Sequence, residues 1–265
     1  MNLDTSQSNR SLIARSVSAR LGDDFELHPL DFELNPGQLV GILGPNGSGK
    51  TTLLRVLSGA LSACSGEVIL NGRLLGDWSP TELAQVLAVV SQKTEMQFPF
   101  SAGQVVLLGR TPYLQGFGFE REQDFKVARQ AMEDTWVDHL SDRLFPYLSG
   151  GEQQRVAIAR GFAQEPSCLL MDEPTASLDL QHKVGLFRLL RKRIQTGMSA
   201  AVVMHDLNQA AQWCDLVYML KEGRLVARGT PSEVLTPENI EKVFSVTVSV
   251  LETPDGGRFY VPQVD

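Results

Sequence analysis

The sequence predicts an α/β fold with a mainly parallel sheet, an N-terminal antiparallel β segment and an inserted helical lobe. Short apolar segments rich in β-branched residues alternate with helical patterns, which is typical of parallel sheets. Before position 36, apolar and polar residues alternate instead, as in antiparallel strands with one solvated face. We therefore expect one domain over 1–265, with the antiparallel segment at 11–36 and a helical lobe formed by about 93–146 and a helix over 149–164.

The elements of the first hundred residues follow from short local patterns. The alternation in FELHPLDFEL predicts a strand over 25–34, and the apolar run GQLVGIL predicts a buried strand over 38–43. A glycine-rich turn leads from that strand into a helix over 51–58. Ser79-Pro80-Thr81-Glu82 combines an N-cap, a proline at the first helical position and a glutamate at N3, so a short helix starts there before a strand over 87–91.

The second part of the chain alternates helices and strands after a mostly helical stretch. Two helices are expected around the glycine- and aromatic-rich loop TPYLQGFGFE, and Thr230-Pro231-Ser232-Glu233 repeats the capping pattern of Ser79. The expected helices span 102–110, 121–138, 150–164 and 180–195, and the expected strands span 168–171 and 200–204.

Composition excludes several classes of protein. Hydrophobic residues make up 43% and charged residues 21% of the 265 residues, so a sizeable core can form and wholesale disorder is excluded. The formal net charge of −7 argues against nucleic acid as the partner. No apolar run approaches the roughly 18 residues needed to cross a bilayer. Any contact with a membrane is therefore expected to come through a partner protein.

The three cysteines indicate neither a disulfide framework nor a zinc site. Cys64, Cys168 and Cys214 are widely spaced and lack any CxxC or Cys/His clustering. The histidines at 28, 139 and 182 likewise form no cluster with them that could ligate iron. We expect reduced thiols.

A phosphate-binding loop follows the strand over 38–43. The pattern GxxxxGK[ST] is complete in Gly44, Pro45, Asn46, Gly47, Ser48, Gly49, Lys50 and Thr51. In such a loop the backbone N–H groups surround the phosphates, the lysine reaches the β- and γ-oxygens and the hydroxyl of the last residue contacts Mg²⁺. We expect these residues and Thr52 to bind a nucleoside triphosphate and Mg²⁺.

A second apolar strand ends in two carboxylates, as the site of such a loop requires. Cys168 to Met171 leads into Asp172-Glu173. A carboxylate beside the phosphate loop can hold the Mg²⁺ shell, which suits Asp172. Glu173 is then the candidate general base that polarises the attacking water. Alone, this pattern is more often a strand entering a turn.

The run Leu148-Ser149-Gly150-Gly151-Glu152-Gln153 resembles the signature of the ATP-binding cassette (ABC) family. Its position, about a hundred residues after the phosphate loop and shortly before Asp172, matches that family. The resemblance covers nearly the whole chain and implies a P-loop NTPase cassette with a RecA-like core. It also implies nucleotide contacts at Ser149, Gly150, Gly151 and Glu152, at a helix start that can bind a γ-phosphate. An ordinary helix cap is the alternative.

The resemblance assigns roles to further residues. Gln92 matches the Q-loop glutamine, a Mg²⁺ and water contact, and His205 matches the switch histidine. Asp179, in Ser177-Leu178-Asp179, matches the D-loop, which in the family crosses the dimer interface. Leu21, beside Arg20, occupies the position where cassettes usually place an aromatic residue on adenine. The family favours ATP, although this segment leaves GTP open.

The resemblance also implies an assembly. In the family, each ATP lies between the phosphate loop of one cassette and the signature of a second cassette. A head-to-tail homodimer with two equivalent ATP sites is therefore expected. Three classes compete: a transporter ATPase, a soluble cassette acting on nucleic acid or ribosomes, and a non-ABC kinase or GTPase. The signature argues against the third. The second usually carries coiled coils or a second cassette, which this sequence lacks.

The segment after Gln92 resembles the ABC importers of iron-siderophores, heme and cobalamin. It contains Phe98-Pro99-Phe100-Ser101 and the run Val105 to Tyr113, which ends in GRTPY. The resemblance implies two copies of a transmembrane permease, a periplasmic binding protein acting on that permease, and a peripheral position at the cytoplasmic face of the bacterial inner membrane. Heme is the expected cargo, with a ferric siderophore or cobalamin as the alternatives.

Overall fold

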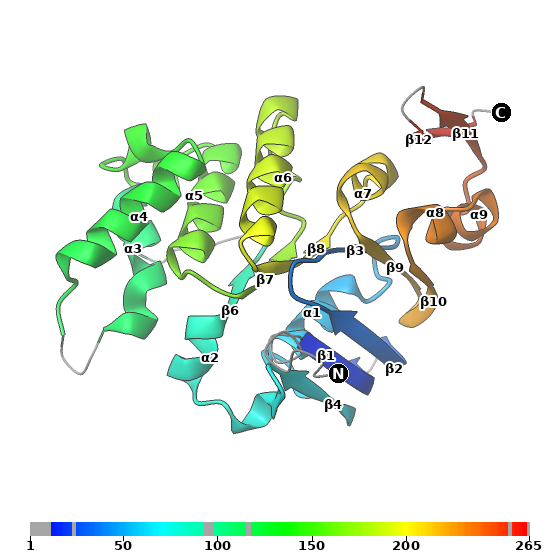
Figure 1. Ribbon diagram of the computed structural model, residues 1–265, viewed down its shortest axis with the longest axis horizontal. Helices are drawn as coiled ribbons and strands as arrows, with labels where there is room; N and C mark the ends of the chain where they lie inside the picture. Colours follow the sequence, from blue (N-terminus) through cyan, green and yellow to red (C-terminus); the bar gives the residue numbers. More distant parts are fainter. Residues whose placement is uncertain (1–11, 23–24, 93–97, 115–117, 254–255, 264–265) are drawn as a thin grey trace, which may run out of the picture. The chain divides into compact units, whose positions relative to one another are not determined.

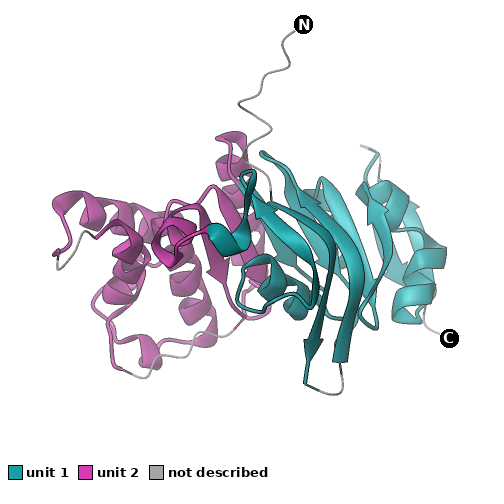
Figure 2. Ribbon diagram, turned by 90° about the horizontal axis from the view of Figure 1, so that it is seen from below, with its two compact units in different colours: residues 1–77, 199–265 teal, residues 78–198 magenta. Residues whose placement is uncertain are grey.

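The computed structural model describes residues 12–22, 25–92, 98–114, 118–253 and 256–263. The chain divides into two compact units, which Figure 2 colours separately. Unit 1 comprises residues 1–77 and 199–265, and unit 2 comprises residues 78–198. The expected single domain over 1–265 stays a prediction. The expected starts of the β segment at Ser11 and of the helical lobe at 93–97 lie outside the described residues.

Unit 1 contains an antiparallel sheet built on the first two strands. β1 (Leu12–Leu21) pairs with β2 (Phe25–Leu34), in a register that places Leu12 opposite Leu34 and Leu21 opposite Phe25. This confirms the antiparallel pair expected from the alternation. The sheet continues on the other side of β1 with β4 (Ser65–Leu70) and β5 (Arg73–Leu74), which the sequence patterns did not indicate.

The parallel strands of unit 1 are its core. β3 (Leu39–Leu43) lies between β8 (Ser199–Val203) and β9 (Leu216–Lys221), parallel to both, and β10 (Arg224–Gly229) pairs antiparallel with β9. Every residue of β3 and β8 is buried, as expected for strands covered on both faces. Each fully buried aliphatic side chain contributes about 1.5–3 kcal/mol. α1 (Lys50–Leu57) follows β3 directly through the glycine-rich loop (Figure 1) and packs against β1.

The end of the chain adds short capped helices and a hairpin to unit 1. These elements are α7 (Leu207–Trp213), α8 (Pro231–Val234), α9 (Pro237–Phe244), β11 (Val248–Glu252) and β12 (Arg258–Pro262). Thr230 and Glu233 form the capping box that the sequence predicts for α8. The side-chain amide of Asn208 fastens the hairpin to α7, since it accepts from the backbone N–H of Tyr260 at 2.7 Å and donates to the Tyr260 carbonyl at 3.2 Å.

Unit 2 has its own parallel strand pair. β6 (Leu87–Val90) pairs with β7 (Cys168–Asp172), and both are largely buried. α2 (Pro80–Val86) precedes β6 and begins with the predicted capping box of Ser79 and Glu82. α6 (Leu180–Gln195) has the bounds that the sequence predicts.

Three helices form the lobe of unit 2, and they pack against one another (Figure 1). They are α3 (Ala102–Leu107), α4 (Glu122–Asp134) and α5 (Gly150–Ala163). The predicted helix over 102–110 is too long, because the chain tightens into a 3₁₀ helix over Leu108–Tyr113 that contains Pro112. The predicted helix over 121–138 is also too long. It ends at Asp134 because Trp136 adopts a positive φ of 57°.

A buried arginine connects the 3₁₀ segment to α4 and to the end of α5. Arg110, whose side chain is 5% exposed, contacts Asp124 at 3.0 Å and Glu165 at 2.7 Å, and donates to the carbonyl of Ala163 at 2.7 Å. Its guanidinium also lies 4.0 Å from the ring centre of Tyr113. The GRTPY run is thus a structural anchor of the lobe. None of the helices that the structure describes is both long and apolar enough to cross a bilayer.

Candidate functional site: a phosphate cradle and two motif loops

The phosphate loop is shaped by close backbone packing in unit 1. A Cβ on Gly44 would lie 2.3 Å from the carbonyl oxygen of Leu220, so only glycine fits there. Gly49 has a φ of 101°, in the region that favours glycine, and caps α1 without a side-chain hydrogen bond. The first N–H groups of α1 therefore have no side-chain cap, which is the arrangement that binds anions at a helix start.

Two polar side chains are buried inside this loop. Ser48 is 1% exposed, and its hydroxyl oxygen has no hydrogen-bond partner among the residues that the structure describes. Lys50 is 5% exposed, and its ammonium donates to the carbonyl oxygens of Gly44 at 2.9 Å and Pro45 at 2.8 Å. A buried cation, an unsatisfied hydroxyl and an uncapped helix start fit a polyphosphate chain. The loop can therefore hold the phosphates that the sequence predicts.

Gln92 and Glu173 meet in unit 2. The amide nitrogen of Gln92 donates to a carboxylate oxygen of Glu173 at 2.6 Å, although 81 residues separate them. Glu173 follows the end of β7 and has a φ of 47°, which is uncommon for a residue with a side chain. Such strained backbone is frequent at functional sites. The structure thus brings together the two residues predicted as the general base and the Q-loop glutamine.

The donor set predicted for Mg²⁺ is chemically suitable. Thr51 would supply a hydroxyl, Asp172 a carboxylate at the end of β7, and Gln92 an amide oxygen, and hard divalent cations prefer such oxygen ligands. Within the described residues, no group of three or more His, Cys, Asp or Glu side chains could hold a metal ion. A small number of protein ligands is typical of Mg²⁺ sites, because the ion usually keeps waters and phosphate oxygens in its coordination shell.

The signature begins α5 as a capping box. Ser149 accepts from the N–H of Glu152, and the Glu152 carboxylate accepts from the N–H of Ser149 at 2.8 Å and from its hydroxyl at 2.7 Å. These hydrogen bonds, the hydroxyl first, hold the pKa of Glu152 below its usual range. The glycines have another role: a Cβ on Gly151 would lie 2.8 Å from the carbonyl oxygen of Ser177. The absence of a side chain at Gly151 therefore leaves space for the loop over 177–179 to pack against the start of α5.

Asp179 caps α6 and contacts a histidine. Its carboxylate accepts from the backbone N–H of His182 at 2.9 Å and lies 2.7 Å from the Nδ1 of the same residue. These two hydrogen bonds, the backbone one first, lower the pKa of Asp179. The sequence patterns identified Asp179 but not its connection to His182, which lies one helical turn further along the chain.

His205 lies in unit 1, between the end of β8 and the start of α7. It is exposed, and the next residue, Asp206, caps α7 by accepting from the N–H groups of Asn208 and Gln209. His205 and the phosphate loop therefore belong to unit 1. Gln92, Asp172, Glu173, the signature and Asp179 belong to unit 2.

Near the phosphate loop, the sequence reasoning missed Phe25. Leu21, the residue at the expected adenine position, is 44% exposed at the end of β1, and Arg20 lies 3.7 Å from Glu26. Phe25 is the cross-strand partner of Leu21, and its ring would lie 2.8 Å from a Cβ on Gly49. An aromatic ring thus lies beside the phosphate loop, on the strand opposite the expected one. The short connection between the two strands could have indicated this position, because it places Phe25 opposite Leu21.

Comparison with known proteins gives the family. The model of the ABC transporter family matches residues 27–176. The hemin import ATP-binding protein HmuV of Gloeobacter violaceus is 42% identical over 92% of this chain and 90% of its own length. The chain belongs to the ABC transporter family. The HmuV of Rhizobium meliloti is 40% identical over 91% of this chain and 94% of its own.

Solved structures agree with this assignment. A metal-chelate type ABC transporter in an inward-facing conformation matches with a TM-score of 0.83 and 28% identity, over 97% of this chain and 98% of that one. The protein cbiO1 of Clostridium perfringens, part of an ABC transporter complex, matches with a TM-score of 0.72 and 29% identity, over 87% of this chain and 92% of that one. The predicted cassette fold and the resemblance to import ATPases are confirmed. This ABC cassette is an ATPase coupled to transport.

Proposed function

We propose that this ABC ATPase powers the import of heme. The assignment of heme as the cargo rests on the similarity to hemin import ATP-binding proteins. This similarity extends over about nine-tenths of both chains at 40–42% identity. The cassette would not touch heme itself, so the assignment rests on the whole chain and not on a heme site. The similarity to a metal-chelate type transporter supports a ferric siderophore or cobalamin as the second candidate.

In this proposal each motif residue named above has one role in hydrolysis. The loop over 44–52 holds the phosphates, with Lys50 on the β- and γ-oxygens. Thr51, Asp172 and Gln92 would hold Mg²⁺, which would supply positive charge beside the phosphate oxygens. Glu173 accepts a proton from the attacking water, for which it must exchange its hydrogen bond with Gln92 for one with the water. His205 holds the γ-phosphate and the water in line.

Adenine recognition is assigned to the end of the β1–β2 hairpin. Leu21 supplies an exposed apolar contact, and Phe25 supplies the aromatic surface, because its ring lies beside Gly49 of the phosphate loop. Stacking of a base on an aromatic ring contributes about 1–3 kcal/mol. This pair takes the place of the aromatic residue that the family usually has at the position of Leu21.

The functional assembly is a head-to-tail homodimer with two equivalent sites. Each MgATP binds the phosphate loop of one copy and Ser149, Gly150, Gly151 and Glu152 of the other. For this the hydroxyl of Ser149 must turn from Glu152 toward the γ-phosphate, which costs one hydrogen bond of the capping box. Binding of the nucleotide closes the dimer, and hydrolysis opens it.

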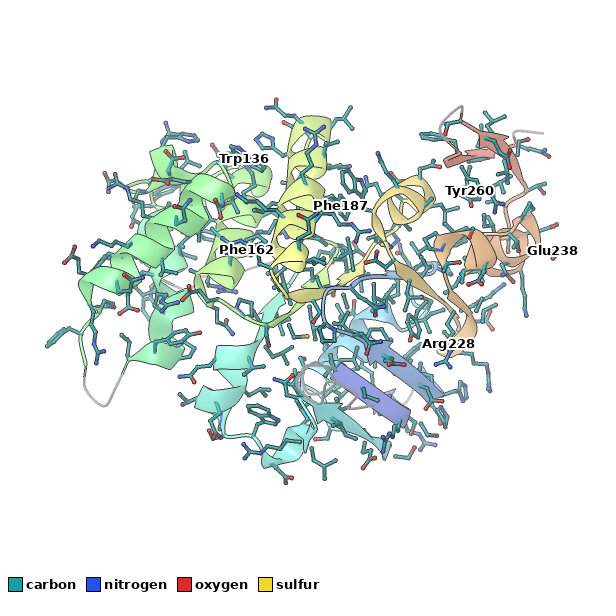
Figure 3. The ribbon with its side chains drawn as sticks, viewed as in Figure 1. Trp136, Phe162, Phe187, Arg228, Glu238 and Tyr260 are labelled. Atoms are coloured by element: carbon teal, nitrogen blue, oxygen red, sulfur yellow. The ribbon has the colours of Figure 1, made fainter. Side chains whose placement is uncertain are left out.

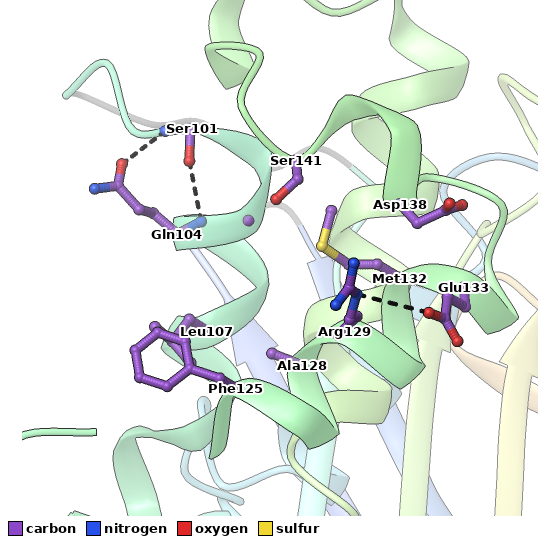
Figure 4. A pocket seen from close by; sticks show the side chains of 11 residues that line it. Ser101, Gln104, Leu107, Phe125, Ala128, Arg129, Met132, Glu133, Asp138 and Ser141 are labelled. Atoms are coloured by element: carbon purple, nitrogen blue, oxygen red, sulfur yellow. Dashed lines mark hydrogen bonds and ion pairs between the residues drawn. The ribbon is translucent and has the colours of Figure 1, made fainter. Parts of the chain in front are cut away.

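Two permease subunits dock on the helical lobe, with a periplasmic binding protein acting on the permease. Two features of the lobe support this placement: Phe98, Leu108 and Phe125 expose 65%, 43% and 53% of their surface, and a cavity of about 430 Å³ opens between α3 and α4. Figure 4 shows that cavity, with Phe125 and Leu107 at one end and Arg129, Glu133 and Asp138 at the other. The chain is thereby held at the cytoplasmic face of the inner membrane, without nucleic acid as a partner.

The cargo is tested by reconstitution. The chain is combined in liposomes with heme, siderophore and cobalamin permeases and their binding proteins, and ATP-dependent uptake of each compound is measured. Uptake of heme alone supports the proposal. Uptake of only a siderophore or of cobalamin would contradict heme as the cargo and would leave the role as a transport ATPase unchanged.

A further inference from the structure

A chain of contacts in unit 2 joins the loop over 177–179 to the ends of two helices. Arg155, on α5, donates through one guanidinium nitrogen to the carbonyl of Trp136 and lies 2.9 Å from the Nε2 of His182. The Nδ1 of His182 lies 2.7 Å from a carboxylate oxygen of Asp179. The contacts therefore run from Trp136, two residues after the end of α4, through α5, to the start of α6.

The partners of the His182 ring determine where its proton lies. Arginine only donates, so the Nε2 of His182 must accept from Arg155 and carries no proton. The Nδ1 then carries the proton and donates it to Asp179, which also accepts from the backbone N–H of His182. In this arrangement Arg155 selects the tautomer of the ring. The His182 side chain is 24% exposed, whereas that of Asp179 is 66% exposed.

The ring is also held by packing. The indole of Trp136 meets the imidazole of His182 edge-on, with ring centres 6.0 Å apart. The same indole lies over Gly185, where a Cβ would come within 2.4 Å of it. Glycine destabilises a helix interior relative to alanine, and the indole explains why glycine stands at 185, because no larger side chain fits beneath it. Figure 3 labels Trp136 beside α6.

We propose that His182 is a positioning residue that fixes Asp179 and the loop over 177–179 against the signature helix. Two contacts connect the loop to α5. The carbonyl of Ser177 packs against Gly151, and Arg155 on the same helix is hydrogen-bonded to His182, which contacts Asp179. The start of α5 and the loop therefore move as one body. The inference rests on the proposed dimer, in which both segments face the second copy.

The test compares three variants of the full chain in MgATP hydrolysis. His182→Phe keeps a ring against Trp136 but removes both hydrogen bonds, and should lower kcat roughly 3- to 10-fold with an unchanged KM for ATP. His182→Gln can donate to Asp179 and accept from Arg155, so it should retain more activity than His182→Phe. His139→Phe, at an exposed histidine of the same unit, is the control and should match the wild type.

Equal activity of His182→Phe and the wild type, or equal loss in His182→Phe and His182→Gln, would overturn the inference. The ¹⁵N NMR spectrum of wild-type His182 gives a second test that needs no variant: the Nδ1–H tautomer supports the inference and the Nε2–H tautomer contradicts it. Absence of hydrolysis in the wild type would instead count against the proposed function. An active wild type with an insensitive His182 would contradict this inference alone.

Discussion

At the scale of single residues, the site is built from strained or buried polar groups that the fold holds in place. Glu173 has a positive φ and is hydrogen-bonded to Gln92, while Lys50 is buried against the carbonyls of its own loop. Both arrangements cost free energy in the protein alone. A bound nucleotide with its water would give Glu173 and Lys50 new partners.

The role of Glu173 as the base is tested by Glu173→Gln. The amide keeps the size of the side chain but cannot take a proton, so steady-state hydrolysis should slow by about 10²–10⁴-fold. ATP affinity, measured by equilibrium binding, should stay at the wild-type value. Turnover within a few-fold of the wild type would show that another group is the base.

The role of Phe25 is tested by comparing a nucleotide with a bare phosphate chain. Phe25→Ala should weaken binding of ATP on the order of 10-fold through lost stacking, and leave binding of inorganic tripolyphosphate unchanged. Calorimetric titration of both ligands measures the two affinities, with Leu21→Ala as the matched variant across the strand pair. An equal loss for ATP and tripolyphosphate would mean that Phe25 only shapes the loop.

At the scale of elements, sequence patterns predicted those helices and strands whose periodicity and caps agree. The strands over 25–34 and 87–91, the capped helices at Ser79 and Thr230 and the helix over 180–195 are found within one residue of the expected bounds. The end of α4 was wrong because a left-handed residue, Trp136, interrupts a pattern that stays amphipathic. β4 and β5 were missed because they pair only with distant or very short partners.

The residues of the candidate site could be predicted from sequence motifs, whereas the hydrogen bonds between these residues could not. The phosphate loop, Asp172-Glu173 and the signature are contiguous in sequence, so their chemistry could be inferred directly. The hydrogen bond from Gln92 to Glu173 and the contact of Arg155 with His182 join residues 81 and 27 positions apart. Such pairs depend on how α5, α6 and β7 pack, which no local pattern records.

The buried ion pair of the helical lobe predicts a pH-dependent contribution to stability. The backbone N–H of Arg121, and then Arg110, hold the pKa of Asp124 below its usual range. A carboxylate of this kind stabilises the fold above its ordinary pKa of about 3.9 and loses that contribution as the pH falls through its lowered value. Asp124→Asn should therefore lower the free energy of unfolding by about 3 kcal/mol at neutral pH, and by less at about pH 3.

Urea unfolding at the two pH values measures this difference. Glu122→Gln is the matched control on the same helix, because its pair with Lys126 is exposed, and it should change stability by less than about 1 kcal/mol. Equal effects of Asp124→Asn at both pH values would show that the ionised form of Asp124 is not what stabilises the lobe.

At the scale of the whole molecule, each nucleotide is expected to need two copies of the chain. Lys50→Ala removes the cation of the phosphate loop and Ser149→Arg blocks the signature, so neither variant alone should hydrolyse ATP. A mixed dimer of the two contains one site with both motifs intact. Mixing the inactive proteins should therefore restore single-turnover hydrolysis. A mixture as inactive as its components would contradict the shared site.

The central claim is that hydrolysis by this cassette drives heme across a membrane. The most direct measurement is heme uptake into liposomes that contain the heme permease, its binding protein and either the wild-type chain or Glu173→Gln. The account predicts uptake that requires MgATP with the wild type and no net accumulation with the variant. Heme accumulation that is independent of ATP, or equal with both proteins, would contradict it.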